Sequence, residues 1–167
     1  MIDDRTNHLI NVISMYLIDR KIDISSFGFD NIENHPEKIS CGICFSPLSR
    51  PVPNGIHYLI LIYPQFDKTI SVIRYTFAAL YSNKSQRINA LNKALSKDDD
   101  YLFIFAFMHE IGHIQHIMEL GINDDMFFNL DNGINSDPNT NFYYENYADN
   151  FALQHIDAIY ELLKNKE

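Results

Sequence analysis

The chain has 167 residues, 46% of them hydrophobic, and a formal net charge of −9. A chain of this length buries about two-thirds of its unfolded surface, so we expect residues 1–167 to form a single domain that needs no disulfide. The net negative charge argues against a nucleic-acid partner. The charged residues at the N-terminus argue against a signal peptide or a membrane anchor, so we expect a cytoplasmic protein.

The N-terminal third predicts one helix and a small amount of sheet. Apolar residues recur at helical intervals from Asp4 to Lys21, which predicts a helix packed on the core. Residues 22–55 are rich in turns, with a short strand candidate at Ile39 to Phe45. The run from Ile56 to Tyr63 is β-branched and aromatic and ends before Pro64, so we expect a strand there. This strand belongs either to a sheet along which an extended peptide binds or simply to the buried core.

Cys41 and Cys44 have the spacing of a redox dithiol or of half a structural zinc site. A four-ligand zinc site needs two more cysteines or histidines, and the chain has no other cysteine. A thioredoxin-like site needs a strand that leads into a helix, whereas prolines follow this segment. A plain pair of thiols in a turn is the simpler interpretation, and a regulatory disulfide or a metal role is the alternative.

Two further helices are predicted in the middle of the chain. One lies near Lys68 to Leu95. The other begins at Asp98-Asp99-Asp100, where carboxylates can cap a helix and interact well with its dipole. This second helix is apolar all round from Tyr101 to Met108, as expected for a helix buried in a small domain. We expect it to end near Gly121, because glycine readily adopts the left-handed conformation at a helix C-terminus.

The sequence His109-Glu110-Ile111-Gly112-His113 lies on this apolar helix. Residues four apart share a helix face, so His109 and His113 can bind one tetrahedral zinc ion. Two buried histidines and a glutamate are costly without a metal or a solvent-filled cleft, which makes a chance match the weaker explanation. Zinc lowers the pKa of bound water towards about 7, and Glu110 is placed to accept the proton as hydroxide attacks a carbonyl. The motif therefore predicts a metallopeptidase with Glu110 as general base.

His116 is the nearest candidate for a third ligand. At a rise of 1.5 Å per residue it lies about 10 Å from His109 along the helix, too far for both to reach one metal. We therefore expect His116 to support a ligand or the fold without binding the metal. The third ligand should lie beyond this helix.

A polar stretch from Asn129 to Asn141 predicts a loop at the rim of the site. Its Asp131-Asn132-Gly133 lacks the spacing of a calcium-binding loop. The helix predicted to follow carries Glu145 and Asp149, four apart on one face. Glu145 can complete a His-His-Glu zinc site with a fourth position open for water. Asp149 can accept a hydrogen bond from a ligand histidine and so fix its tautomer.

The HExxH motif, followed after about thirty residues by Glu145-Asn146-Tyr147-Ala148-Asp149-Asn150-Phe151-Ala152, resembles the gluzincin branch of zinc metallopeptidases. The minimal soluble members fit best: the IrrE/ImmA family, whose members cleave helix-turn-helix repressors, and the phage-exclusion Lit type. The resemblance covers residues 101–155. It implies that His109, His113 and Glu145 bind zinc, that Glu110 is the base and that Asp149 orients a ligand. The extra helix expected before the motif is closer to the Lit type.

We therefore expect an α+β, zincin-like domain with a central HExxH helix, a small sheet and a second ligand-bearing helix. The expected activity is zinc-dependent cleavage of a peptide bond in a specific intracellular protein, such as a regulator or host factor. Two alternatives stay open: a catalytically silent module that binds a protein, and a toxin or defence component controlled by a partner. Glu110 favours an enzyme, because a structural zinc has no need of a base.

Overall fold

The computed structural model describes residues 2–38, 41–48, 57–82, 87–121 and 138–165. These segments are mainly helical with one small sheet, which confirms the coarse α+β class. None of the helices in these segments is long and apolar enough to span a membrane. In chain order the elements are α1 (Asp4–Asp19), β1 (Phe27–Asn31), two 3₁₀ turns (Ile32–Asn34 and Pro36–Lys38), β2 (Ile43–Pro47), β3 (Tyr58–Ile62), α2 (Phe66–Ser82), α3 (Ile88–Ala94), α4 (Asp99–Leu120) and α6 (Pro138–Lys164).

The three strands are arranged in the order β1-β3-β2. β1 is parallel to β3, with Phe29 opposite Ile60, and β2 is antiparallel to β3, with Phe45 opposite Ile60. The strand predicted at 56–63 is therefore the central strand of the described sheet. Its residues 60–62 are buried, as expected of a strand that is covered on both faces. The outer strand β2 makes the most extensive contact of the described strands with α4.

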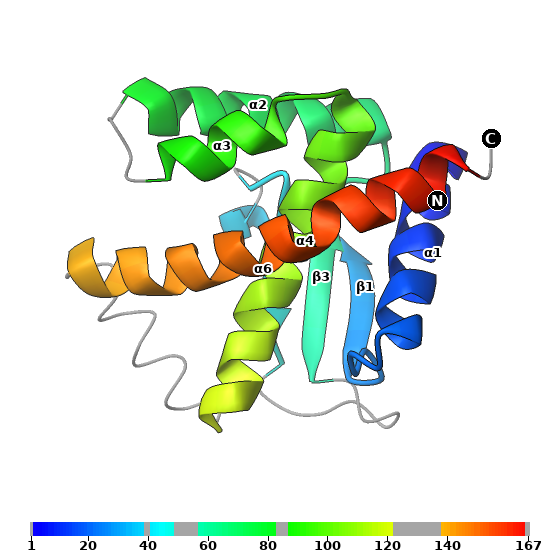
Figure 1. Cartoon of the computed structure of the whole chain (residues 1–167), viewed down its shortest axis with the longest axis horizontal. Helices are drawn as coiled ribbons and strands as arrows, with labels where there is room; N and C mark the ends of the chain where they lie inside the picture. Colours follow the sequence, from blue (N-terminus) through cyan, green and yellow to red (C-terminus); the bar gives the residue numbers. More distant parts are fainter. Residues whose placement is uncertain (1, 39–40, 49–56, 83–86, 122–137, 166–167) are drawn as a thin grey trace.

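Helix α4 runs through the middle of the molecule (Figure 1). As predicted, a side-chain oxygen of Asp98 accepts a hydrogen bond from the N–H of Tyr101 at 3.1 Å and caps the helix. Gly121 ends it with a φ of 62°, also as predicted. The helix is apolar on all sides because it contacts β2, α1, α2, α3 and α6. Its position in the core gives the two histidines of the motif a rigid base.

Helix α6 crosses α4 at a steep angle (Figure 1), and this is the most extensive contact between helices. Gly112 permits the close approach: a Cβ placed there would lie 2.8 Å from the Cα of Ala148 and 3.1 Å from its carbonyl oxygen. Ala148 and Ala152 are fully buried. Small residues at this crossing therefore bring Glu145 and Asp149 of α6 up to the histidines of α4.

Several boundaries differ from those predicted. Helix α6 begins at Pro138, so the end of the loop predicted at 129–141 is helical; proline is well suited to a first helical turn, where no N–H is needed. The rest of that loop, including the calcium-like sequence, lies outside the described residues. The helix predicted near Lys68 to Leu95 is two helices, α2 and α3. Helix α1 ends at Asp19, and Lys21 follows with a φ of 59°.

Asp3 joins the start of α1 to the start of α2. Its carboxylate accepts hydrogen bonds from the N–H of Thr6 at 2.8 Å and from the N–H of Phe66 at 2.6 Å. We expect Asp3→Ala to lower the free energy of unfolding by about 1–2 kcal/mol in urea titrations, because two helix starts lose their acceptor. The exposed neighbour gives a matched control: Asp4→Ala should change stability by less than about 0.5 kcal/mol. Equal losses of unfolding free energy in Asp3→Ala and Asp4→Ala would show that the hydrogen bonds to Asp3 do not stabilise the fold.

The stabilisation that the carboxylate of Asp3 provides depends on pH. Burial raises the pKa of Asp3, but the N–H groups of Phe66 and Thr6 lower it more, so the folded pKa lies below 3.8. The stabilisation by Asp3 is therefore complete at a pH above the pKa of Asp3 in the unfolded protein. It is lost as the pH falls through the lower pKa of Asp3 in the folded protein. The difference between wild type and Asp3→Ala should shrink accordingly in strongly acidic solution.

Candidate metal centre

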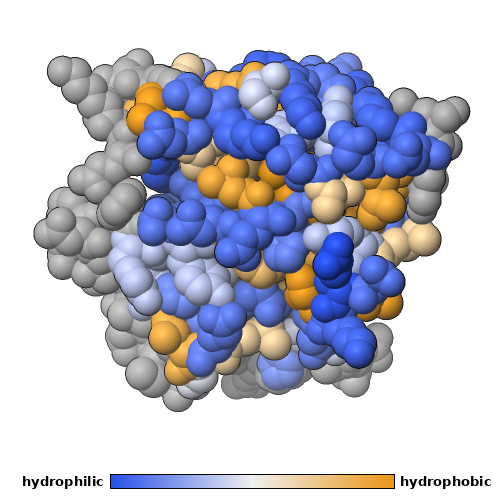
Figure 2. Space-filling model, viewed as in Figure 1, coloured by the Kyte–Doolittle hydropathy of each residue, from blue (hydrophilic) through white to orange (hydrophobic). Residues whose placement is uncertain are grey.

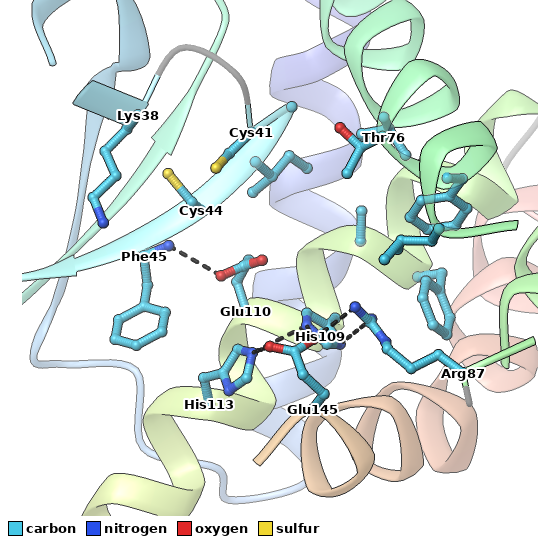
Figure 3. A pocket seen from close by; sticks show the side chains of 17 residues that line it. Lys38, Cys41, Cys44, Phe45, Thr76, Arg87, His109, Glu110, His113 and Glu145 are labelled. Carbon is cyan, nitrogen blue, oxygen red and sulfur yellow. Dashed lines mark hydrogen bonds and ion pairs between the residues drawn. The ribbon is translucent and has the colours of Figure 1, made fainter. Parts of the chain in front are cut away.

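Two histidines of α4 and one glutamate of α6 converge on one point (Figure 3). The Nε2 atoms of His109 and His113 lie 3.0 Å apart. Glu145 places Oε2 at 3.3 Å from Nε2 of His109 and Oε1 at 3.4 Å from Nε2 of His113. Within the described segments, this is the one group of three or more His, Cys, Asp or Glu side chains that could hold a metal ion. The structure thus brings together the three residues that the sequence singled out as ligands.

These separations fit a small tetrahedral ion. Ligand atoms about 2.0–2.1 Å from a tetrahedral centre lie about 3.3 Å from one another. The two imidazole nitrogens are 3.0 Å apart, and each lies 3.3 or 3.4 Å from a different oxygen of the Glu145 carboxylate. Calcium and magnesium prefer sets of oxygen ligands, which a pair of imidazoles does not supply. The chemistry and spacing of the donors therefore suit a divalent ion that accepts nitrogen ligands.

Asp149 lies against one histidine of this group, as its position four residues after Glu145 predicts. Its Oδ1 lies 2.9 Å from Nδ1 of His109, and its side chain is only 5% exposed. An Nδ1–H that donates to this carboxylate leaves Nε2 of His109 as the atom directed at the metal group. Asp149 therefore fixes both the tautomer and the orientation of the His109 ring.

Arg87 completes the site and was not predicted. This residue immediately precedes α3, and its guanidinium donates two hydrogen bonds to Asp149, at 2.7 and 2.8 Å. Its third nitrogen lies 2.6 Å from Oε2 of Glu145. One buried cation therefore holds the two carboxylates of α6 side by side and offsets their repulsion. No local pattern around Arg87 marks it, because its partners are far away in the sequence.

The charges of the site shift several pKa values. Burial raises the pKa of Glu145, but hydrogen bonds and charges from His109 and His113 hold it well below its ordinary value. Burial and Arg87 lower the pKa of His109, whereas Asp149 and Glu145 raise it to about 9. Metal ligands bind as neutral imidazoles, so a metal that binds here displaces a proton from His109.

Glu110 lies beside the metal group without belonging to it. Its Oε2 accepts a hydrogen bond from the backbone N–H of Phe45 on β2 at 3.1 Å. Burial raises the pKa of Glu110 and outweighs the histidine charges that lower it, which suits a carboxylate that has to take up a proton. The ring of Phe45 lies 5.6 Å from that of His113. Phe45 is thus a second contributor to the site that the motif itself did not predict.

A cavity of about 280 Å³ adjoins these residues. Figure 3 shows Glu110, His109, His113 and Glu145 pointing into one space from α4 and α6. On the face seen in Figure 2, hydrophilic residues cover most of the surface, and hydrophobic residues show in a band between α3 and α6. The lining of the cavity is Lys38, Cys41, Gly42, Ile43, Cys44, Phe45, Ile73, Thr76, Phe77, Leu80, Arg87, Phe105, Ala106, His109, Glu110, His113 and Glu145.

His116 is not part of the metal group. Its ring stacks on Tyr147 of α6, with centroids 4.0 Å apart and planes 8° apart, and it also contacts Tyr143 and Tyr144. It is 2% exposed, and its Nδ1 has no hydrogen-bond partner among the described residues. Burial lowers the pKa of His116. The residue therefore packs α6 onto α4 close to the turn that carries Glu145.

Comparison with known proteins found no family model that matches this sequence, no matching curated protein and no matching solved structure.

Proposed function

We propose that the protein is a zinc-dependent endopeptidase in which His109, His113 and Glu145 bind zinc and Glu110 is the general base. The observation that carries this proposal is the convergence of two imidazole nitrogens 3.0 Å apart with the carboxylate of Glu145, whose two oxygens lie 3.3 and 3.4 Å from them, and with the carboxylate of Glu110 beside this group. Three protein ligands of this kind, with a fourth position left for water, are typical of catalytic zinc sites. Bound zinc would supply a Lewis acid that polarises a carbonyl and acidifies water.

The residues of the chain would perform the proton transfers and the positioning. Glu110 takes a proton from the attacking water and returns it to the leaving amine. The N–H of Phe45 holds that carboxylate between β2 and the metal group. Asp149 and Arg87 keep His109 and Glu145 in place.

The substrate we propose is an extended segment of a specific intracellular protein. β2 is an outer strand of the described sheet, and its residue Phe45 lies directly beside Glu110. A peptide aligned along β2 would therefore carry its backbone past the metal group. The resemblance to IrrE/ImmA and Lit peptidases supports a regulator or host factor as the target.

Incubation of the zinc-loaded protein with a peptide library tests this function, with new termini identified by mass spectrometry. We expect cuts at a recurring sequence, and we expect a chelator to abolish them and added zinc to restore them. Zinc bound at the site without any cut in peptides or folded proteins would favour the silent binding module instead. Cleavage that appears only after a bound protein is removed would favour the toxin or defence component.

A further inference from the structure

Cys41 and Cys44 lie in the wall of the same cavity (Figure 3). Cys44, on β2, is 8% exposed, whereas Cys41, just before the strand, is partly exposed. They are not joined by a disulfide. In the part of the chain that the structure describes, no third His, Cys, Asp or Glu joins them in a metal-binding group. Among the described residues the metal role considered from the sequence therefore finds no further ligand, and the redox role is the one that the surroundings favour.

The turn between the two cysteines is held in place by packing. The N–H of Cys41 donates to the carbonyl of Lys38 at 2.9 Å. Gly42 lies so close to α2 that a Cβ there would be 2.3 Å from Cγ1 of Ile73 and 2.9 Å from the carbonyl oxygen of Thr69. These contacts fix the backbone before the pair and between its two cysteines, and the side chains of Cys41 and Cys44 are in hydrogen-bond contact.

The two cysteines differ in their surroundings. A hydrogen bond with Cys41, together with burial and the charge of Glu110, raises the pKa of Cys44. The ammonium group of Lys38 lines the same cavity and lowers the pKa of Cys44, but by less than these effects raise it. The buried thiol of Cys44 is therefore harder to deprotonate than an ordinary cysteine thiol. Cys41 is the more exposed of the two residues, so a reagent that enters the cavity meets it first.

We infer that Cys41 and Cys44 are a redox-active dithiol that a hydroperoxide converts to a disulfide, with Cys41 attacking and Cys44 resolving. First, the thiolate of Cys41 attacks the terminal oxygen; an S–O bond forms, the O–O bond breaks, and the alkoxide leaves as an alcohol with the proton that Cys41 released. Then the sulfur of Cys44 attacks that of Cys41; the S–S bond forms, the S–O bond breaks, and hydroxide leaves as water with the proton of Cys44. The sulfurs lose two electrons, and the peroxide gains them.

The disulfide would form next to the catalytic carboxylate of the proposed function. Cys44 directly precedes Phe45, whose N–H holds Glu110. Oxidation therefore acts on the strand that positions Glu110, whereas the metal ligands lie on α4 and α6. The dithiol itself does not depend on the proposed function, so its chemistry can be tested without a substrate.

The test is treatment of the full chain with hydrogen peroxide, followed by alkylation and mass spectrometry of the peptide that holds both cysteines. We expect this peptide to lose two hydrogen atoms, about 2 Da, and to resist alkylation until a reductant is added. In Cys44→Ser, we expect dimedone to trap a sulfenic acid on Cys41. In Cys41→Ser, Cys44 should not be labelled.

Three results would overturn the inference. One is a wild-type peptide that still carries two alkylatable thiols after peroxide treatment. Another is oxidation that yields only disulfide-linked dimers of the chain. The third is dimedone labelling of Cys44 in Cys41→Ser, which would reverse the assigned roles. The wild-type measurement alone decides the first two, so the inference stays testable even where a variant folds poorly.

Discussion

Replacement of Glu110 by glutamine is expected to lower the kcat for peptide hydrolysis by at least about 100-fold, the usual range for loss of a general base. Glutamine keeps the size of the side chain and an oxygen that can accept the N–H of Phe45. It cannot take up the proton of the attacking water. Because Glu110 is outside the metal group, zinc content should stay unchanged.

A matched control is available on the same helix. Glu119 is exposed on α4 and lies outside the cavity lining, so Glu119→Gln should leave kcat within about twofold of wild type. Activity of Glu110→Gln above a tenth of wild type would show that another group serves as the base. A loss of zinc in Glu110→Gln would show that its carboxylate supports the ligands rather than proton transfer.

Gly112→Ala is expected to destabilise the protein by about 1–3 kcal/mol through overpacking. Inside an exposed helix the same change would stabilise by about 1 kcal/mol, because alanine is the better helix former. Here the new methyl group would lie 2.8 Å from the Cα of Ala148 and 3.1 Å from its carbonyl oxygen. Backbone atoms cannot rotate out of the way, so α6 has to shift as a whole. The shift moves Glu145 away from the histidines, and we expect zinc affinity to fall as well.

Urea unfolding and zinc titration of Gly112→Ala test this expectation. Met118→Ala, at an exposed position of the same helix, is the control and should change stability by less than about 0.5 kcal/mol. Increased stability in Gly112→Ala would show that the helices can separate without cost. Reduced stability with unchanged zinc affinity would show that Glu145 does not depend on the close approach of α6.

The sequence predicts the features that depend on neighbours along the chain. Asp98 and Gly121 mark the two ends of α4, and both act there as caps. The four-residue spacing of His109 and His113 places both imidazoles on one helix face, which is enough to predict their convergence. Glu145 is a candidate both because a carboxylate completes a His-His-Glu site and because its helix resembles that of gluzincins, and its carboxylate does lie next to both imidazoles.

The features that the sequence does not predict depend on contacts between distant segments. Arg87 contacts α6 from the position just before α3, and nothing nearby in the sequence indicates its partly buried ion pairs. Phe45 contributes a backbone N–H, which any residue except proline would carry. The loop predicted at residues 129–141 rests on amino-acid composition alone. Composition could not indicate that α6 starts at Pro138. Tertiary packing, rather than local preference, decides each of these cases.

The most direct measurement is the metal content per chain of protein purified without chelator, compared between wild type and Glu145→Ala. We predict about one zinc per wild-type chain and loss of most of it in the variant, because two imidazoles alone bind zinc far more weakly than a three-ligand site. Circular dichroism of both proteins shows whether the variant is folded. Zinc retained in full by a folded Glu145→Ala, or a wild-type protein that binds no zinc even when it is supplied, would contradict the account.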